Sequence, residues 1–278
     1  MAILSIQSAV VYGHVGNSAA ALPLERLGFE VWRLDTVSFS NHPGHGAFAG
    51  RVTPAPELRQ LLDGIARLGV LGQCEGVLTG YMGEAENAAV AADAVRRVKQ
   101  ANAVALYLLD PVIGDEGRSY VRPGVAEAIR DDLLPLADVV KPNLFELAWL
   151  TGRPVGTIEE TKLAARALLS RGPEAVIVTA LARDPSAEML AVGAEGAWLA
   201  KAPYVARGFN GTGDLMAALV LGHWLKGEPL ARVLALAASG VAEAIRATVA
   251  KGTKELALIE TIDRIVKPPT LLPVERID

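Results

Sequence analysis

Cysteine is nearly absent from this chain: of its 278 residues only Cys74 carries a thiol, beside four histidines. A single cysteine excludes an intramolecular disulfide framework and any cysteine-rich zinc or iron–sulfur site. Lysine and arginine total 27 against 31 aspartate and glutamate residues, so the basic excess typical of nucleic-acid-binding proteins is missing. No apolar run approaches the roughly 18 residues of a membrane span, and the N-terminus lacks the basic region of a signal peptide. These absences predict a cytoplasmic protein with neither nucleic acid nor membrane as a partner.

The composition predicts a large folded core, since hydrophobic residues make up 51% of the chain and charged residues 21%. Short apolar runs predict strands over residues 2–11, 30–35, 76–80, 103–109, 137–140 and 175–179, then a hairpin of 189–192 with 197–200. Helical periodicity predicts helices over residues 17–27, 56–68, 84–100, 125–133, 144–150, 158–170, 215–226, 230–249 and 259–266. This alternation is typical of a three-layer α/β fold, a doubly wound, mostly parallel sheet flanked by helices. Because no linker or repeat interrupts it, residues 1–278 are expected to form one domain without a large separate lid.

Polar side chains gather at the ends of the predicted strands. In chain order they are Ser8, His14, Tyr81, Asp110, Lys141-Pro142-Asn143 and Thr179. Ligands of open parallel sheets bind at the carboxyl ends of the strands, so these residues predict a site at that edge. Residues 39–56 are expected to form a surface loop of the kind that closes over ligands.

The segment Gly208-Phe209-Asn210-Gly211-Thr212-Gly213-Asp214 opens an apolar helical pattern. Its glycines let the backbone approach a ligand closely, and the first turn of a helix adds unpaired N–H donors and a positive dipole end. These groups predict a cradle for an anion such as a transferring phosphoryl group. Asp214 is placed to accept a proton from a substrate hydroxyl. The alternative is an ordinary helix start in which Asp214 is only a cap.

Two further segments carry carboxylates at strand ends. Asp110 and Asp115 follow the predicted strand 103–109, where paired carboxylates suit Mg²⁺ directly or through water. A turn built from Asp, Pro and Gly is the alternative for this segment. Asn143 and Glu146 share a face of the first turn of a predicted helix. Glu146 could hold a metal-bound water near nucleotide phosphates, or it could close a capping box with Asn143.

Other catalytic patterns are missing from the sequence. There is no G-x-x-x-x-G-K-[ST] segment, which excludes a P-loop enzyme, and there is no G-x-S-x-G elbow. His14 and His45 show no metal-ligand spacing. We therefore expect both histidines to act as hydrogen-bonding groups in loops.

In this order, the segments resemble those of the ribokinase-like superfamily, and most closely those of the pyridoxal kinases. The similarity runs through nearly the whole chain. It includes Ile6-Gln7-Ser8, residues 11–17 (VYGHVGN), residues 37–42 (VSFSNH), Gly80-Tyr81-Met82-Gly83, residues 110–115 (DPVIGD), residues 142–146 (PNLFE) and Gly211-Thr212-Gly213-Asp214. The last segment is shared by many sugar kinases, whereas the first three point to the pyridoxal kinases.

The resemblance implies ATP-dependent phosphorylation of the 5′-hydroxymethyl group of pyridoxal, giving pyridoxal 5′-phosphate in vitamin B6 salvage, with pyridoxine and pyridoxamine as further substrates. It implies that Asp214 is the catalytic base and that the amides of Gly211 to Gly213 form the anion hole. The implied substrate-binding residues are Ser8, Pro43, Gly44, Tyr81 and Asp214. Those implied for ATP are Asp110, Asn143, Glu146, Thr179, Ala202, Pro203, Tyr204, Val205 and Thr212, and those for Mg²⁺ are Asp110, Asp115 and Glu146. Relatives are usually homodimers, and we expect the same here.

Two positions depart from the family pattern. The family often has a threonine after Asn-His in the substrate loop, whereas Pro43-Gly44 follows here and supplies no hydroxyl. The contact of that hydroxyl with the substrate ring is therefore lost or replaced. Lys141 stands where some relatives have a threonine near a monovalent cation, and we hypothesise that its ammonium takes the place of that cation. The alternative is a solvated lysine at the end of a strand.

Two other functions fit part of the pattern. A related kinase of the superfamily would act on hydroxymethylpyrimidine or a sugar, but Ser8, the Tyr12-Gly13-His14 run and Tyr81 suit a flat pyridine ring better than a polyol. A vitamer-binding or regulatory protein would keep the fold without turnover. Asp214 beside both glycines argues against that reading, since a binding protein needs no base there.

Overall fold

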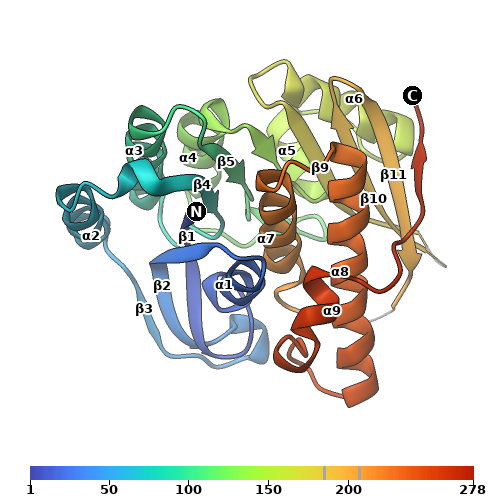
Figure 1. The fold of residues 1–278 in the computed structure, drawn as a ribbon, viewed down its shortest axis with the longest axis horizontal. Helices are drawn as coiled ribbons and strands as arrows, with labels where there is room; N and C mark the ends of the chain where they lie inside the picture. The colour runs from blue at the N-terminus through green and yellow to red at the C-terminus, as the bar shows by residue number, and fades with distance from the viewer. Residues whose placement is uncertain (184–185, 206–207) are drawn as a thin grey trace.

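A mixed sheet forms the centre of the molecule. The computed structural model describes residues 1–183, 186–205 and 208–278, and among them ten strands pair in the order β12-β11-β10-β9-β8-β5-β4-β1-β2-β3 (Figure 1). The parallel strands are β1 (Ala2–Tyr12), β2 (Glu30–Asn41), β4 (Cys74–Thr79), β5 (Leu106–Leu109), β8 (Val139–Val140) and β9 (Ala175–Arg183). Antiparallel pairing adds β3 (Gly50–Val52) at one edge and β10 (Ser186–Gly193), β11 (Gly196–Pro203) and β12 (Val274–Arg276) at the other.

Helices cover both faces of this sheet and give the molecule three layers (Figure 1). One face carries α2 (Ala55–Arg67), α3 (Ala85–Ala101), α4 (Val125–Ala128), α5 (Leu144–Thr151) and α6 (Ile158–Leu169), whose apolar sides share one buried core. The other carries α1 (Asn17–Arg26), α7 (Thr212–Leu225), α8 (Leu230–Lys251) and α9 (Ile262–Val266), which enclose a second core. The predicted three-layer, doubly wound α/β fold is confirmed, and the described residues include no separate lid domain.

Short elements complete the chain. They are the 3-10 turns η1 (Pro43–His45), η2 (Leu71–Gln73), η4 (Leu134–Leu136) and η5 (Ile259–Thr261), the π-helical turn η3 (Ile129–Leu133), and a small hairpin of β6 (Gly114–Asp115) with β7 (Arg118–Ser119). The predicted helix 125–133 is therefore α-helical only up to Ala128 and continues as η3. The predicted hairpin is confirmed as β10 and β11, which pair from Ser186 with Pro203 to Gly193 with Gly196.

The topology brings the predicted polar residues to one edge of the sheet. The strand order reverses at β1, which pairs with β2 on one side and with β4 on the other. A crevice forms at such a switch point, at the carboxyl ends of the strands. Helix α7 is apolar on nearly all sides, and Leu215 to His223 are buried between the sheet and the neighbouring helices. This packing fixes the N-terminus of α7 at the same edge as the crevice.

The prediction that residues 39–56 form one loop is wrong in part. Strand β2 continues to Asn41, and β3 pairs antiparallel with it, Phe39 opposite Gly50. The rings of Phe39 in β2 and Phe48 in the loop before β3 pack with centroids 4.8 Å apart, and this contact helps to hold the short, largely exposed β3 against β2. Residues 42–49 keep the loop character, with His42 capping η1 by accepting a hydrogen bond from the Gly44 amide.

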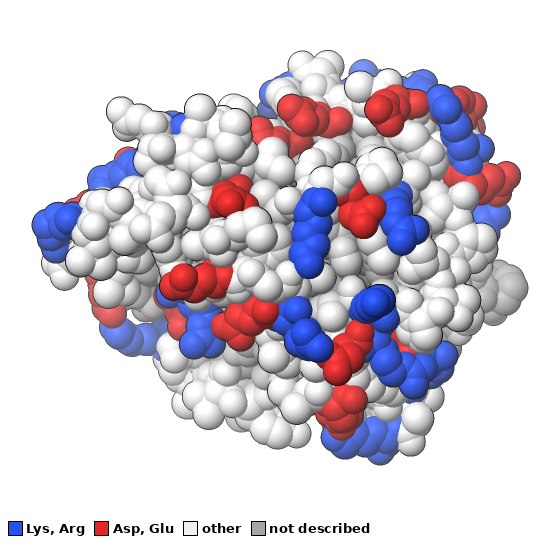
Figure 2. Space-filling view, viewed as in Figure 1, with Lys and Arg blue, Asp and Glu red and all other residues white. Residues whose placement is uncertain are grey.

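The surface carries charges of both signs. On the face seen in Figure 2, lysine and arginine side chains alternate with aspartate and glutamate, and no wide area of one sign is visible. Helix α8 is the one described helix long and apolar enough to cross a membrane, but 67% of its apolar window is buried inside the protein. Its hydrophobicity therefore serves the core between α7, α9 and the sheet.

Candidate active site

A cavity of about 1220 Å³ opens at the carboxyl ends of the parallel strands. All the residues that the resemblance implies for the site line it: Ser8, Pro43, Gly44, Tyr81, Asp110, Asp115, Asn143, Glu146, Thr179, Ala202, Pro203, Tyr204, Val205, Gly211, Thr212, Gly213 and Asp214. They come from elements spread over more than 200 positions of the chain, so the fold gathers them into one place. His14 and Pro142, which the strand ends also placed at this edge, do not line the cavity.

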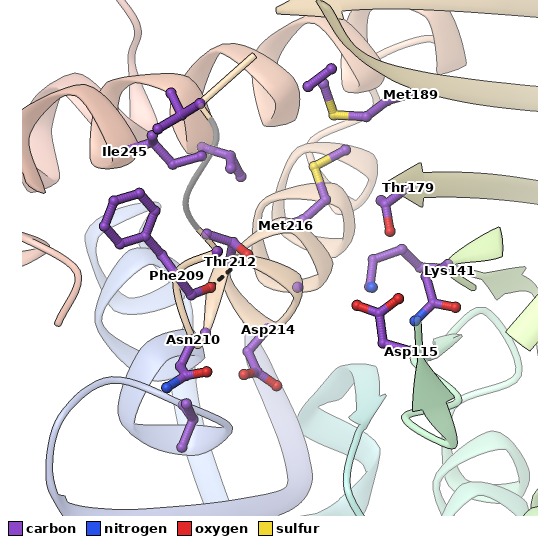
Figure 3. Close-up of a pocket in the computed structure, with 18 of the residues that line it drawn as sticks. Asp115, Lys141, Thr179, Met189, Phe209, Asn210, Thr212, Asp214, Met216 and Ile245 are labelled. Carbon is purple, nitrogen blue, oxygen red and sulfur yellow. Dashed lines mark hydrogen bonds between the residues drawn. The ribbon is translucent and has the colours of Figure 1, made fainter. Parts of the chain in front are cut away.

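The loop before α7 has the geometry of an anion cradle. Gly211 has φ +85°, and a Cβ there would lie 1.8 Å from the carbonyl oxygen of His14, so no other residue fits. Phe209 anchors the loop in the core, and the Thr212 hydroxyl donates to the Phe209 carbonyl over 3.1 Å (Figure 3). The first turn of α7, whose N–H groups have no partner within the helix, therefore starts from a rigid loop that can hold an anion.

Asp214 lies in this first turn and lines the cavity. Burial raises the pKa of its carboxyl, and the Gly16 amide, the Lys141 ammonium and His42 oppose that rise by favouring the charged form. A carboxyl whose pKa is raised is a stronger base when ionised, which suits proton abstraction from an alcohol. The N-cap of α7 is Gly211, which has no side chain, so Asp214 is not the N-cap residue; its carboxylate lies in the first turn and accepts from its own amide.

Lys141 forms a buried ion pair in the wall of the cavity. Its Nζ lies 3.1 Å from Oδ1 of Asp110, and both side chains are 4% exposed. Burial lowers the pKa of Lys141, but Asp110, Glu146 and Asp214 outweigh it and raise the pKa above its usual value. Burial also raises the pKa of Asp110, while Lys141 opposes this rise. The alternative of a solvated lysine is wrong: this is a fixed cation among three carboxylates.

The ammonium of Lys141 also faces the anion cradle. A Cβ on Gly213 would lie 3.7 Å from Nζ, so the missing side chain of this glycine leaves open the space between the ammonium and the first turn of α7. A phosphoryl group in that space would meet the amides on one side and the ammonium on the other.

Asn143 and Glu146 form the capping box that the sequence left as an alternative. The Glu146 amide donates to Oδ1 of Asn143, and the Asn143 amide donates to Oε2 of Glu146, each over 2.9 Å. Oε1 of Glu146 accepts from the Ile113 amide, also over 2.9 Å, and the Asn143 side-chain amide donates to the Gly114 carbonyl. Glu146 is thus a fixed carboxylate that still lines the cavity, and the Asn143 side chain accepts one hydrogen bond and donates one within the protein.

The three carboxylates predicted for Mg²⁺ do not form a direct metal site. Among the described residues, no group of three His, Cys, Asp or Glu side chains is arranged to hold a metal ion. Asp110 is paired with Lys141, and Asp115 lies at the exposed rim, where Oδ1 accepts from the Glu116 amide. This arrangement fits Mg²⁺ only in the way it binds nucleotides, through phosphates and waters with one or two carboxylates nearby.

One end of the cavity, called the small end below, lies near β1 and η1. Ser8, Tyr81, Pro43 and Gly44 line it, and the Tyr81 backbone is held by a hydrogen bond of 2.6 Å from the Thr36 hydroxyl to its carbonyl. Burial lowers the pKa of His42 and so favours the neutral ring, whose Nδ1 accepts from the Gly44 amide. His14 and His45 also hydrogen-bond in loops, to the Ser18 carbonyl and the Glu255 carboxylate, as predicted.

The opposite end of the cavity, called the large end below, is lined in part by apolar side chains. Met189, Met216 and Ile245 lie on the far side of the anion cradle from Asn210 and Asp214 (Figure 3). Thr179 lies beside Asn143, with which it forms an isolated parallel bridge. The cavity thus has a small end and a large end, separated by the N-terminus of α7.

The sequence did not single out every residue that lines the cavity. Asn210, Arg118 and His42 line it as well. Asn210 lies between Phe209 and Gly211, and its side chain points to the same side as that of Asp214 (Figure 3). Its Nδ2 lies 3.5 Å from the position of a Cβ on Gly44. The signal for Asn210 in the sequence is its place inside the glycine segment.

Comparisons with known proteins agree with this geometry. A family model described as phosphomethylpyrimidine kinase matches residues 70–258. The chain is 47% identical to pyridoxal kinase PdxY of Rubrobacter xylanophilus, over 99% of this chain and 97% of that protein. It is 45% identical to pyridoxal kinase PdxY of Deinococcus radiodurans, over 99% and 96%. A solved pyridoxal kinase from Leishmania donovani, in complex with ADP and pyridoxamine, superposes with a TM-score of 0.94 at 30% identity, covering 100% and 99% of the two chains.

The fold and the cavity define a ribokinase-like kinase, a phosphotransferase that uses an alcohol group as acceptor. Sequence identity to named relatives over the full length then distinguishes between the kinases of this class. The chain belongs to the pyridoxal kinase family, and this reading is favoured over a kinase of hydroxymethylpyrimidine.

Proposed function

We propose that this chain transfers the γ-phosphoryl group of ATP to the 5′-hydroxymethyl group of pyridoxal, giving pyridoxal 5′-phosphate and ADP. The observation that carries the proposal is one juxtaposition: the Asp214 carboxylate, the open space at Gly213 and the Lys141 ammonium meet where the small and large ends of the cavity join. The small end takes the pyridine ring and the large end takes the nucleotide.

The transfer needs one proton acceptor and a stabilised phosphoryl group. Asp214 takes the proton of the 5′-hydroxyl as the O5′–P bond forms and the bond from Pγ to the β–γ bridging oxygen breaks. The negative charge passes to the ADP leaving group. The Gly211, Thr212 and Gly213 amides, with Lys141, hold the equatorial oxygens of the group in transit.

On the substrate side, Ser8 is proposed to hydrogen-bond the ring and Tyr81 to cover one of its faces. Pro43 and Gly44 close the loop side of the ring. On the nucleotide side, the proposed ATP-binding residues are Asp110, Asn143, Glu146, Thr179, Ala202, Pro203, Tyr204, Val205 and Thr212. Because its side chain is already committed, Asn143 would act there by fixing Glu146 and the β6–β7 hairpin.

Mg²⁺ is proposed to accompany ATP, bound mainly by the phosphates. Glu146 and Asp110 would hold it through water, with Asp115 at the rim; when bound, the ion neutralises charge on the phosphates. The residues of the chain orient the nucleotide and exclude bulk water from the space at Gly213.

A substrate panel tests the proposed function. Purified protein is incubated with ATP and pyridoxal, pyridoxine, pyridoxamine or hydroxymethylpyrimidine, with ADP release and product mass as readouts. We expect pyridoxal to be phosphorylated at the 5′-hydroxyl. Exclusive use of hydroxymethylpyrimidine would favour the related kinase, and tight pyridoxal binding without product over long incubation would favour a binding protein.

Asn210 is proposed to replace the hydroxyl that Pro43 cannot supply. Its amide has no hydrogen-bond partner among the described residues, and it faces the small end of the cavity beside Gly44. Asn210→Leu keeps the size and removes the polar group, so KM for pyridoxal should rise about tenfold, the value of one hydrogen bond, with kcat and KM for ATP little changed. Steady-state kinetics on the three vitamers measures this, and an unchanged KM for all of them would contradict it.

A homodimer, a single domain and a cytoplasmic location remain parts of the proposal. The projecting ends of β1 and β2 and the following loop carry exposed apolar side chains, Val11, Tyr12 and Phe48. Such a group of apolar side chains suits a protein interface. Sedimentation of the purified protein, with Val11→Lys as the comparison, would separate a dimer from a monomer.

A further inference from the structure

Glu255 joins two loops of the active site that lie far from it in the sequence. It follows α8 and lies in the segment before η5, with its side chain 12% exposed. Oε1 lies 2.6 Å from Nε2 of His45, and Oε2 accepts a hydrogen bond of 3.0 Å from the His14 amide. One carboxylate thus uses both oxygens to hold two separate loops.

Each of these loops contributes directly to the cavity. His45 ends η1, whose Pro43 and Gly44 line the small end. His14 lies in the β1–α1 loop, where its carbonyl is pressed against Gly211 and where the Gly16 amide donates to Asp214. Glu255 therefore ties the substrate loop to the loop that holds the catalytic base.

The contacts around the Glu255 carboxylate hold it in one position. Gly13 has φ +99°, and a Cβ there would lie 2.2 Å from Oε2 of Glu255, so only glycine lets the carboxylate approach the His14 amide. The ring of Tyr12 meets that of His45 edge to face, with centroids 6.0 Å apart, on the other side of the pair. The Glu255 backbone is also held, because its carbonyl accepts from the Thr253 hydroxyl.

We propose that Glu255 is a positioning residue that sets the distance between the substrate loop and Asp214. Glu255 does not line the cavity; it acts through His45 on Pro43-Gly44 and through His14 on Gly211 and Asp214. The proposal rests on the proposed function, and it names the device that closes the small end of the cavity over the pyridine ring.

Kinetics of three variants test this role: Glu255→Ala, His45→Ala and the double variant. Because both single changes release the same loop, each should raise KM for pyridoxal about tenfold or more, with KM for ATP within about twofold, and the double variant should be no worse than the worse single variant. Glu255→Gln keeps an acceptor for the His14 amide and should recover part of the loss.

A matched control is Asp263→Asn. Asp263 pairs with Arg26 over the same distance, 2.6 Å, and also links the C-terminal region to the N-terminal one, but neither residue lines the cavity. Its kinetics should equal those of the wild type. Thermal unfolding of all variants shows whether each one folds.

Three results would overturn the positioning role: an unchanged KM for pyridoxal in folded Glu255→Ala, equal rises in both KM values, or additive effects in the double variant. Failure of the positioning role can be distinguished from failure of the proposed function. If the wild type phosphorylates another hydroxymethyl compound, the same three variants are tested on that compound; if it phosphorylates none, the proposed function fails before Glu255 is tested.

Discussion

Asp214→Ala should reduce turnover about 10²- to 10⁴-fold, the usual contribution of a single general base, while ATP binding stays largely intact. The carboxylate lies on one side of the anion cradle, and the large end of the cavity, proposed for the nucleotide, lies on the other side. Gly211 and the packing of α7 do not depend on this side chain, so the cradle should persist. A coupled assay measures turnover and calorimetry measures ATP affinity; unchanged turnover would remove Asp214 from the role of base.

The pH dependence of the wild type gives an independent check on the same residue. Burial raises the pKa of Asp214, and only the ionised carboxylate can accept a proton. As a result, kcat should fall as the pH drops through the raised pKa of Asp214. This acid limb of the pH profile should lie at a higher pH than the limb that an ordinary aspartate would give. The residual activity of Asp214→Ala should lack this limb, and a limb at the same pH in both proteins would assign it to another group.

Lys141→Met should lower turnover about 10²- to 10³-fold, as removal of one preorganised donor to an anion usually does. The methionine fills a similar volume, so the main change is the loss of the charge that faces the space at Gly213. Without it, Asp110, Glu146 and Asp214 lie near the incoming phosphates with no protein cation among them. Turnover at saturating ATP is the measurement, and wild-type turnover would rule out contact with the phosphoryl group.

The same variant should be less stable, and a second change separates stability from catalysis. Leaving Asp110 buried and unpaired costs about 3–5 kcal/mol of unfolding free energy. Adding Asp110→Asn removes the unpaired charge, so denaturant unfolding of Lys141→Met/Asp110→Asn should show recovered stability without recovered turnover. Recovery of both stability and turnover would mean that Lys141 affects turnover only by stabilising the folded protein.

Alkali-metal ions test the hypothesis that the Lys141 ammonium takes the place of a bound monovalent cation. The wild type should show no strong activation by K⁺, since the site already holds a fixed charge of the same sign. Strong K⁺ activation of the wild type, compared with Na⁺ at equal ionic strength, would count against the hypothesis.

Local sequence patterns predicted the parts of this protein whose causes are local. Gly211 and Asp214 could be singled out because a tight turn into a helix needs glycine and because the glycines place this acid beside the unpaired N–H donors of the helix start. The capping box is likewise local, because it links Asn143 to Glu146, three positions further along the chain. The layers of the fold could be predicted from the alternation of apolar runs with helical periodicity, because the pattern within each strand or helix shows which of its residues are buried.

Contacts between distant segments could not be predicted in this way. Nothing near Lys141 in the sequence shows whether its ammonium is solvated or buried; the answer comes from Asp110 and Asp214, which the fold brings to it. Glu255 and His45 are 210 positions apart, so no local pattern connects them. Strand β3 was missed for the same reason, because β2 stabilises it across the ribbon.

Single-turnover phosphoryl transfer is the most direct measurement of the chemistry assigned to this cavity. Wild type and Asp214→Asn, each preloaded with ATP labelled in the γ-phosphate, are mixed with saturating pyridoxal and quenched at successive times. The wild type should pass the label to the 5′-oxygen within one turnover, and the variant, with ATP equally bound, about 10²- to 10⁴-fold more slowly. Transfer by Asp214→Asn at the wild-type rate would contradict the assignment of Asp214 as the base beside the anion cradle.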